Sequence, residues 1–128
     1  MKILSGVDTI RIDRLQQVNP AIRKRFFQRV FNPEELDFIK EIDERAAGIF
    51  SAKEAVSKVL GTGIGPIRWQ EITIHHSQFG KPSVYLSGRA MAFSEQLGIV
   101  SWSVSISHSR ENAVAIAVAL SCINNPDS

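Results

Sequence analysis

The chain has 128 residues and a net charge of +2, with 44% hydrophobic and 22% charged residues. This composition predicts one soluble domain over residues 1–128 and excludes a mostly disordered chain. No stretch reaches the ~20 consecutive apolar residues of a membrane-spanning helix, and Asp8 follows the N-terminus too closely for a signal peptide. The single cysteine, Cys122, cannot form an internal disulfide, so a reducing cytoplasm is expected.

The first half of the chain is predicted to be mainly helical. A strand is expected over 2–10, followed by helices over 12–18, 21–30, 32–41 and from Asp43 or Glu44 to Leu60. The helix over 21–30 should turn Ile22, Phe26, Phe27 and Val30 inward. Asn32 suits an N-cap and Gly61 suits the C-terminal cap of the longest helix.

The second half of the chain is predicted to be mainly strands. They are expected over 69–74, 84–86, 101–107 and 113–120, with a hairpin connection over 75–82, a helix over 87–97 and a frayed tail from about 121 to 128. The strand over 113–120 is apolar on both faces, which predicts complete burial. His75 and His76 are expected at the surface. The fold class is therefore α+β, with an N-terminal strand and helices packed on a mainly antiparallel sheet.

Charge is unevenly distributed along the helical half. Six basic residues lie between 11 and 29 against one acid, Asp13; they are Arg11, Arg14, Arg23, Lys24, Arg25 and Arg29. Six acids follow between residues 34 and 45. The basic segment is a candidate surface for an acidic partner, although its composition does not identify that partner.

Glu54 and Lys58 lie one helical turn apart, opposite the apolar side of their helix. One interpretation is a surface ion pair worth about 0.3–0.5 kcal/mol. The other takes the pair together with the glycine-rich turn over 60–65, whose backbone N–H groups would hold phosphate oxygens. A carboxylate, an ammonium group and backbone donors are together typical of a metal-assisted phosphoryl site.

Asp8 and His108 end predicted strands. Asp8 either caps the next helix or supplies a magnesium ligand together with Glu54, and sequence spacing leaves both interpretations open. His108 is either hydrogen-bonded locally or contacts phosphate as a proton carrier. No Cys/His spacing indicates zinc, and no Gly-x-Ser-x-Gly segment indicates a serine hydrolase.

Four segments resemble motifs of the holo-acyl-carrier-protein synthases and occur in that family's order. They are the Gly-x-Asp opening at 6–14, the Lys-Glu-Ala-x-x-Lys helix at 50–61, the Gly-Lys-Pro hairpin at 79–82 and the Ser-x-Ser-His strand end at 105–109. The similarity covers nearly the whole chain. It implies a compact α+β subunit that forms a homotrimer with active sites between neighbouring subunits.

The resemblance also implies roles for individual residues. Asp8 and Glu54 match the Mg²⁺ ligands, and Lys58 matches the residue that faces the phosphates of coenzyme A. The remaining implied contacts are Gly61, Gly63, Gly65 and His108 to coenzyme A, and Arg11, Arg14 and Arg25 to the acidic helix of the acyl carrier protein. Many members have arginine where this chain has Ile49, and Arg45 is the nearest replacement.

The implied reaction moves 4′-phosphopantetheine from coenzyme A to a serine of the apo-carrier and releases adenosine 3′,5′-bisphosphate. Asp8, Glu54 and Lys58 are its expected catalytic residues, and the base that takes the serine proton is left open. One alternative is a nucleic-acid-binding domain that uses the basic residues and phenylalanines of 11–29; the acidic segment that follows argues against it. A second alternative is a non-catalytic module that binds coenzyme A or a nucleotide.

Overall fold

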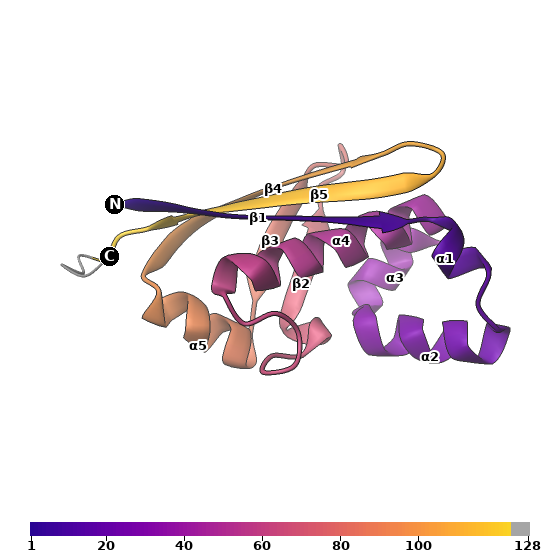
Figure 1. Ribbon diagram of the computed structural model, residues 1–128, viewed down its shortest axis with the longest axis horizontal. Helices are drawn as coiled ribbons and strands as arrows, with labels where there is room; N and C mark the ends of the chain where they lie inside the picture. The colour runs from indigo at the N-terminus through magenta and orange to yellow at the C-terminus, as the bar shows by residue number, and fades with distance from the viewer. Residues whose placement is uncertain (124–128) are drawn as a thin grey trace.

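The computed structural model of the protein describes residues 1–123, in which a three-stranded antiparallel sheet covers one side of a long central helix (Figure 1). The strands are β1 (Lys2–Arg11), β4 (Ile99–His108) and β5 (Asn112–Ser121). Their order is β1-β5-β4, so the last strand pairs with the first and both ends of the chain lie at the same end of the sheet.

The remaining elements lie below and behind this sheet. They are α1 (Asp13–Gln16), α2 (Pro20–Val30), α3 (Pro33–Ile39), α4 (Asp43–Leu60), the 3₁₀ turn η1 (Trp69–Glu71), β2 (Ile72–His76), β3 (Pro82–Leu86) and α5 (Gly88–Gln96). Strands β2 and β3 form a separate antiparallel hairpin. The predicted α+β class and antiparallel pairing are confirmed. Within residues 1–123, no helix combines the length and apolar character needed to cross a bilayer.

Helix α4 packs against the inner face of the sheet and forms the centre of the core. Many of its buried residues are small: Ala46, Ala47, Gly48, Ser51, Ala52, Ala55 and Ser57. Two glycines allow a close approach to the edge strands. A Cβ at Gly6 of β1 would collide with the carbonyl oxygen of Ala55, and one at Gly48 would lie 2.8 Å from Cγ2 of Ile106 on β4. The sheet and helix therefore lie closer together than larger side chains would permit.

The outer face of the sheet is open, which corrects the prediction that β5 is buried on both faces. Residues of β5 alternate between buried and exposed, and Ile116 is 48% exposed. On the adjacent β1, Val7 pairs with Ile116 and is also exposed. A strand with apolar residues on both faces has the same sequence pattern whether both faces are covered or one is open. The periodicity of hydrophobic residues therefore could not show that nothing within the described residues 1–123 covers the outer face of β5.

Several local predictions also need correction. Ile22 is exposed and does not turn inward, although Phe26 and Phe27 of the same helix are half-buried. Residues 69–71 form a 3₁₀ turn instead of the start of a strand, because the Glu71 side chain accepts a hydrogen bond from the N–H of Arg68. Ser121 still belongs to β5, so the predicted tail begins later; residues 124–128 lie outside the described part of the chain.

Candidate active site

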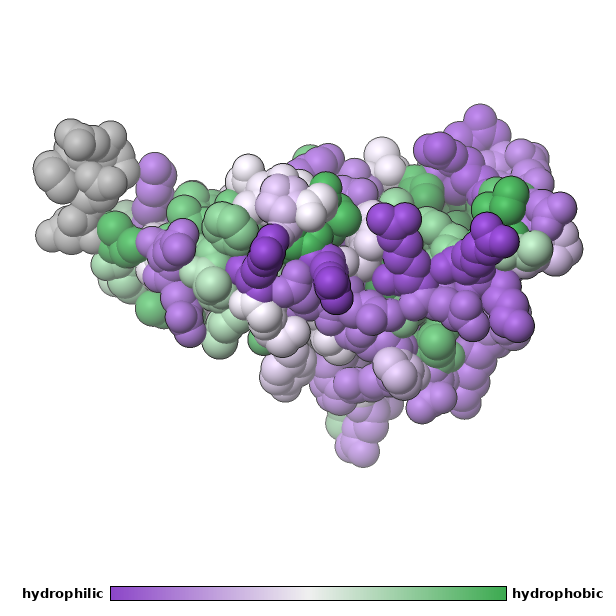
Figure 2. Space-filling view, turned by 90° about the horizontal axis from the view of Figure 1, so that it is seen from below, coloured by the Kyte–Doolittle hydropathy of each residue, from purple (hydrophilic) through white to green (hydrophobic). Residues whose placement is uncertain are grey.

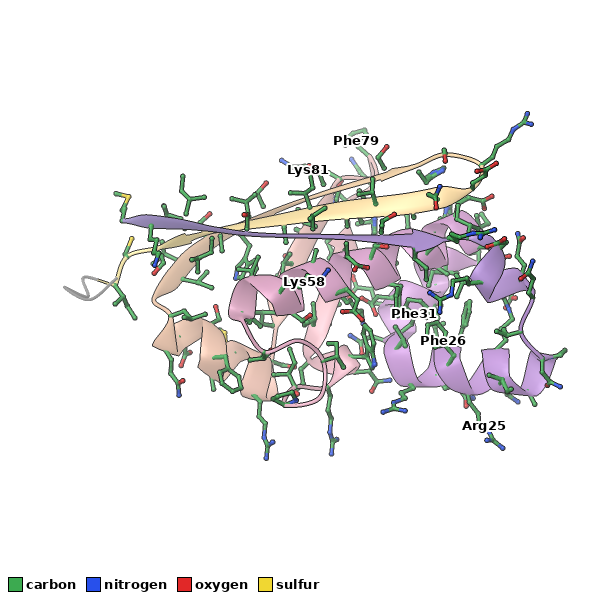
Figure 3. The ribbon with its side chains drawn as sticks, in the orientation of Figure 1. Arg25, Phe26, Phe31, Lys58, Phe79 and Lys81 are labelled. Atoms are coloured by element: carbon green, nitrogen blue, oxygen red, sulfur yellow. The ribbon has the colours of Figure 1, made fainter. Side chains whose placement is uncertain are left out.

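Asp8 and Lys58 meet where β1 crosses α4. The Lys58 ammonium nitrogen lies 3.1 Å from Oδ1 of Asp8 and donates to the carbonyl oxygen of Val7 at 2.9 Å. Gly6 brings the strand against the helix at this point, because its missing side chain leaves room for the backbone of Ala55. Figure 3 shows Lys58 on α4 beneath β1. Two residues that are 50 positions apart in the chain therefore form one charged cluster.

Glu54 belongs to the same cluster. Partial burial raises the pKa of its carboxyl group, the negative charge of Asp8 raises it further, and Lys58 acts in the opposite direction. Asp8 and Glu54 therefore repel one another across a short distance. Lys58 forms an ion pair with Asp8 alone and acts on Glu54 as a nearby charge, so this cluster has two carboxyl groups and one ammonium group.

This donor set fits a magnesium ion. Mg²⁺ is usually held by one or two protein carboxylates and completes its shell with substrate phosphates and water. In the described residues 1–123, no group of three or more His, Cys, Asp or Glu side chains is arranged to hold a metal alone. Asp8 and Glu54 would thus supply part of a coordination shell, and a phosphate-bearing substrate would supply more of it.

The glycine-rich turn after α4 differs from the expected phosphate cradle. Gly61 is left-handed (φ 79°) and caps the helix, while the N–H groups of Thr62 and Gly63 both point to the carbonyl oxygen of Ser57. The N–H of Gly65 bonds to the carbonyl oxygen of Ile67. The N–H groups of Thr62, Gly63 and Gly65 already donate to backbone carbonyl oxygens, so the expectation that they are free to hold phosphate oxygens is wrong. Positive φ angles explain the glycines at 61, 63 and 65.

His108 lies on the other side of α4, in a hollow of about 230 Å³ that Arg45, Ile49 and His76 also line. The His76 ring stacks on Phe38 with centroids 3.7 Å apart, and the Arg45 guanidinium lies 4.8 Å from the same Phe38 ring. His76 was expected at the surface but is half-buried. Burial, with His75 and Arg45 nearby, lowers the pKa of His76, so this ring is neutral at pH 7.

The hollow and the carboxylate cluster are separate within this chain. Asp8 pairs with Ala115 of β5, which in turn pairs with Ile106 of β4, so β5 lies between the two edge strands. Neighbouring strands are about 4.8 Å apart, which places Asp8 and Ile106 roughly 10 Å from each other. Helix α4 packs against the sheet between them. The fold thus brings Asp8, Glu54 and Lys58 together but leaves His108 in a second group.

The predicted basic surface divides into structural and exposed residues. Arg23 pairs with Asp43 and donates to the carbonyl oxygen of Leu15, so it holds α2 to the body of the protein. Arg11, Arg14 and Arg25 are all exposed, and Arg11 also pairs with Asp13 at 2.6 Å. In Figure 3, Arg25 projects away from the body of the protein. Figure 2 shows a mostly hydrophilic face on the side of α2, whereas hydrophilic and hydrophobic residues are mixed on the side of α5.

The aromatic residues of α2 pack inward. Phe26 makes an edge-to-face contact with Phe31, with centroids 6.3 Å apart, and Phe27 does the same at 5.1 Å. Figure 3 shows Phe26 and Phe31 in the space between α2 and α4. Rings held in this way are not available to stack on bases, which weakens the nucleic-acid alternative.

Sequence reasoning missed a buried ion pair between Glu35 and Lys53. Its two charged groups lie 2.6 Å apart, and both side chains are completely buried. Helical periodicity could not have found it, because Lys53 is flanked by Ala52 and the candidate site residue Glu54, and lysine and glutamate are rarely buried.

The whole chain resembles proteins of known activity. Residues 5–119 match a family described as the 4′-phosphopantetheinyl transferase superfamily. The holo-[acyl-carrier-protein] synthase of Caldanaerobacter subterraneus is 40% identical over 94% of this chain and 96% of its own length. That of Clostridium acetobutylicum is 44% identical over 88% and 93%. The crystal structure of the Helicobacter pylori enzyme in complex with coenzyme A superposes with a TM-score of 0.83 at 32% identity, covering 91% of this chain and 100% of that one.

Proposed function

The chain belongs to the 4′-phosphopantetheinyl transferase superfamily, and we propose that it acts as a holo-[acyl-carrier-protein] synthase. It transfers the phosphopantetheine group of coenzyme A to a serine hydroxyl of an acyl carrier protein. The observation that carries the proposal is the convergence of Asp8, Glu54 and Lys58 in a chain that matches such enzymes along nearly its whole length. We place the enzyme in the cytoplasm, where its carrier substrate and coenzyme A would be available.

The three clustered side chains have distinct tasks in this reaction. Asp8 and Glu54 would hold Mg²⁺, which neutralises charge on the diphosphate of coenzyme A and aligns it. Lys58 is half exposed, so its ammonium group can leave Asp8 and contact the phosphate of the departing nucleotide. This contact becomes stronger as negative charge develops on the leaving group.

The covalent step is a displacement at phosphorus. The serine oxygen of the carrier forms a bond to the phosphorus that bears pantetheine, and the bond from that phosphorus to the bridging oxygen breaks. Adenosine 3′,5′-bisphosphate leaves with the electron pair of the broken bond. The serine proton passes to a base, either a carboxylate of the cluster or water.

The hollow around His108 suits the nucleotide end of coenzyme A. Arg45 supplies positive charge, and the Phe38–His76 stack supplies an aromatic surface. Ile49 forms an apolar, fully buried part of the lining, so the charge that an arginine would supply at this position comes from Arg45, one turn earlier. Gly61, Gly63 and Gly65 would border the bound cofactor without donating their N–H groups.

A homotrimer would bring the carboxylate cluster of one subunit close to the hollow of the next. Two features support this assembly. The outer face of the sheet exposes a band of apolar residues, Ile3, Val7, Val114 and Ile116, which would be covered by neighbouring subunits. The two groups of candidate residues are also separated within one chain. Size-exclusion chromatography with light scattering should give three times the mass of the subunit.

The exposed basic residues near the start of α1 and on α2 would bind the acidic helix of the carrier. Arg14 and Arg25 are exposed, and Arg11 lies at the end of β1, three residues after Asp8. Charge reversal of Arg14 to glutamate should raise KM for the carrier more than KM for coenzyme A, because coenzyme A does not contact this surface. Equal changes in the two constants would contradict carrier docking at this position.

The reaction is tested by the intact mass of a purified apo-acyl carrier protein. Incubation with this enzyme, coenzyme A and Mg²⁺ should add one phosphopantetheine, and EDTA should prevent the gain. Coenzyme A binding without modification of several apo-carriers would instead support the non-catalytic module.

A further inference from the structure

The reaction described above does not use Glu35 and Lys53, the only two charged side chains that are completely buried within residues 1–123. The Lys53 ammonium group donates to the carbonyl oxygens of Val30 at 2.6 Å and Trp69 at 3.2 Å. Glu35 accepts from the N–H groups of Asn32 at 2.7 Å and Ile74 at 2.8 Å. Burial raises the pKa of Glu35 and lowers that of Lys53, while the attraction between them acts in the opposite direction on both.

The charges of the Glu35–Lys53 pair are opposite in sign to those of the helix ends that they contact. Val30 is the last residue of α2, whose carbonyl groups form the negative end of the helix dipole, and the Lys53 cation lies there. Glu35 lies in the first turn of α3, at the positive end of that helix. Through their hydrogen bonds the two side chains join α2, α3, α4, η1 and β2 at one point. Such a pair can stay charged in the core because each group is satisfied.

The rotation and axial position of helix α4 are set by few large interlocking side chains. Small residues form shallow ridges over much of its buried surface, beside four larger apolar side chains, and interlocking ridges normally help to set a helix's rotation and axial position. Lys53 provides the one buried ionic contact of this helix within residues 1–123. Glu54 is the next residue, about 100° further around the axis. A small rotation of α4 about its axis would therefore move the Glu54 carboxylate relative to Asp8.

We propose that the Glu35–Lys53 ion pair is a positioning device that fixes the rotation of α4 and so holds Glu54 opposite Asp8 for a divalent cation. This inference rests on the proposed function, because it assigns Asp8 and Glu54 to the metal. Glu35 and Lys53 act through Glu54 and touch neither substrate. They differ from ordinary core residues in that their loss should weaken metal binding even in a protein that remains folded.

The test measures metal binding separately from turnover. Free Mn²⁺ is titrated by electron paramagnetic resonance in the presence of saturating coenzyme A and without carrier protein. The double variant Glu35→Gln/Lys53→Met removes both charges, and the amide introduced in place of the Glu35 carboxylate can still serve one donor and one acceptor. We expect its Kd for Mn²⁺ to rise about tenfold or more, as for other groups that orient metal ligands. Its affinity for coenzyme A in EDTA should stay within about twofold of the wild type.

Two further variants separate a positioning role of the ion pair from a general loss of stability. Glu35→Asp retains both charges and shortens the reach by one methylene, so it should fold and also weaken Mn²⁺ binding. Ile72→Ala removes a completely buried side chain of β2 that holds no polar partner, and it should lose stability without losing Mn²⁺ affinity. Wild-type Mn²⁺ affinity in the folded double variant and in Glu35→Asp, or an equal loss in Ile72→Ala, would overturn the positioning role. Failure of the wild-type protein to bind Mn²⁺ would overturn the metal assignment itself and this inference with it.

Discussion

Two lysines of α4 lie five positions apart and occupy opposite kinds of environment. Lys53 is completely buried, and its ammonium group is shared among Glu35 and two backbone carbonyl oxygens. Lys58 has half of its side chain exposed and pairs with Asp8, next to a second carboxylate, Glu54. One site is closed and fully satisfied, whereas the other is open and has more negative than positive charge.

The contrast separates residues that hold the fold from residues that carry the reaction. A buried charge is tolerated only where partners satisfy it, and its removal leaves the partner unpaired in the core. An exposed ion pair contributes little to stability because water and salt screen it. Stability should therefore depend mainly on Lys53, whose ion pair acts on turnover only through the position of Glu54. Turnover should depend directly on the cluster around Lys58, although both lysines lie on the same helix.

Turnover should respond most strongly when Glu54 is replaced by glutamine. Glu54→Gln keeps the shape of the side chain but removes the negative charge of a proposed metal ligand, so kcat/KM for carrier modification should fall by at least about a thousandfold, or about 4 kcal/mol. The circular dichroism spectrum should match that of the wild type. Near-normal turnover by the folded variant would contradict the assignment of Glu54 to the metal.

Replacing Lys53 by methionine should act mainly on stability. Lys53→Met leaves the Glu35 carboxylate and the carbonyl oxygens of Val30 and Trp69 without their partner in the core. Urea denaturation should show a loss of about 3–5 kcal/mol in the free energy of unfolding. A loss below about 1 kcal/mol, the value expected for an exposed pair, would show that the buried pair does not stabilise the fold.

The same substitution at Lys58 should have the opposite profile. Lys58→Met removes the cation that we propose contacts the leaving phosphate, so kcat should fall by about a hundredfold, the lower end of the effect of losing one preformed donor. The free energy of unfolding should change by less than about 1 kcal/mol, because the pair with Asp8 is half exposed. The comparison between the lysines fails if Lys58→Met unfolds the protein or leaves kcat unchanged.

A smaller effect is expected on the stability of the metal-free protein, which Glu54→Gln should increase. The pKa of Glu54 is raised in the folded state, so the folded protein holds this proton more tightly than the unfolded chain does. Stability is then lost as pH rises from the ordinary glutamate pKa of about 4.3 through the raised value. Glutamine escapes this loss, so in EDTA at pH 7 the variant should melt at a higher temperature than the wild type.

The pH profile supplies the control for this last prediction. At a pH of about 3, well below the ordinary glutamate pKa, the wild-type Glu54 is protonated in both states, and the difference in melting temperature between the two proteins should disappear. If Glu54→Gln melts at or below the wild-type temperature at pH 7, the ionised Glu54 carboxylate does not destabilise the metal-free fold, and the prediction is wrong. Added Mg²⁺ and coenzyme A should reverse the order, since only the wild type gains from binding them.

Local sequence signals predicted most of the secondary structure. The strongest of them, the apolar periodicity and caps of α4, gave bounds that the structure confirms at Asp43–Leu60. Asp8 and Lys58, which form an ion pair in the structure, belong to the Gly-x-Asp and Lys-Glu-Ala-x-x-Lys motifs, which together predicted one common site. Two of the misplaced features depend on packing: the half-burial of His76 requires Phe38, and the exposure of Ile116 depends on whether another layer covers β5.

Sequence alone was enough to establish the order of helices and strands, the family and the three charged residues of the proposed active site. These properties are carried by local periodicity, caps and short motifs. Long-range packing established that Lys53 is buried while Lys58 is open, and that His108 lies on the far side of α4 from Asp8. Burial and proximity depend on segments far apart in the chain, because Val30, Glu35 and Trp69 enclose one lysine, and a glycine on β1 brings Asp8 to the other.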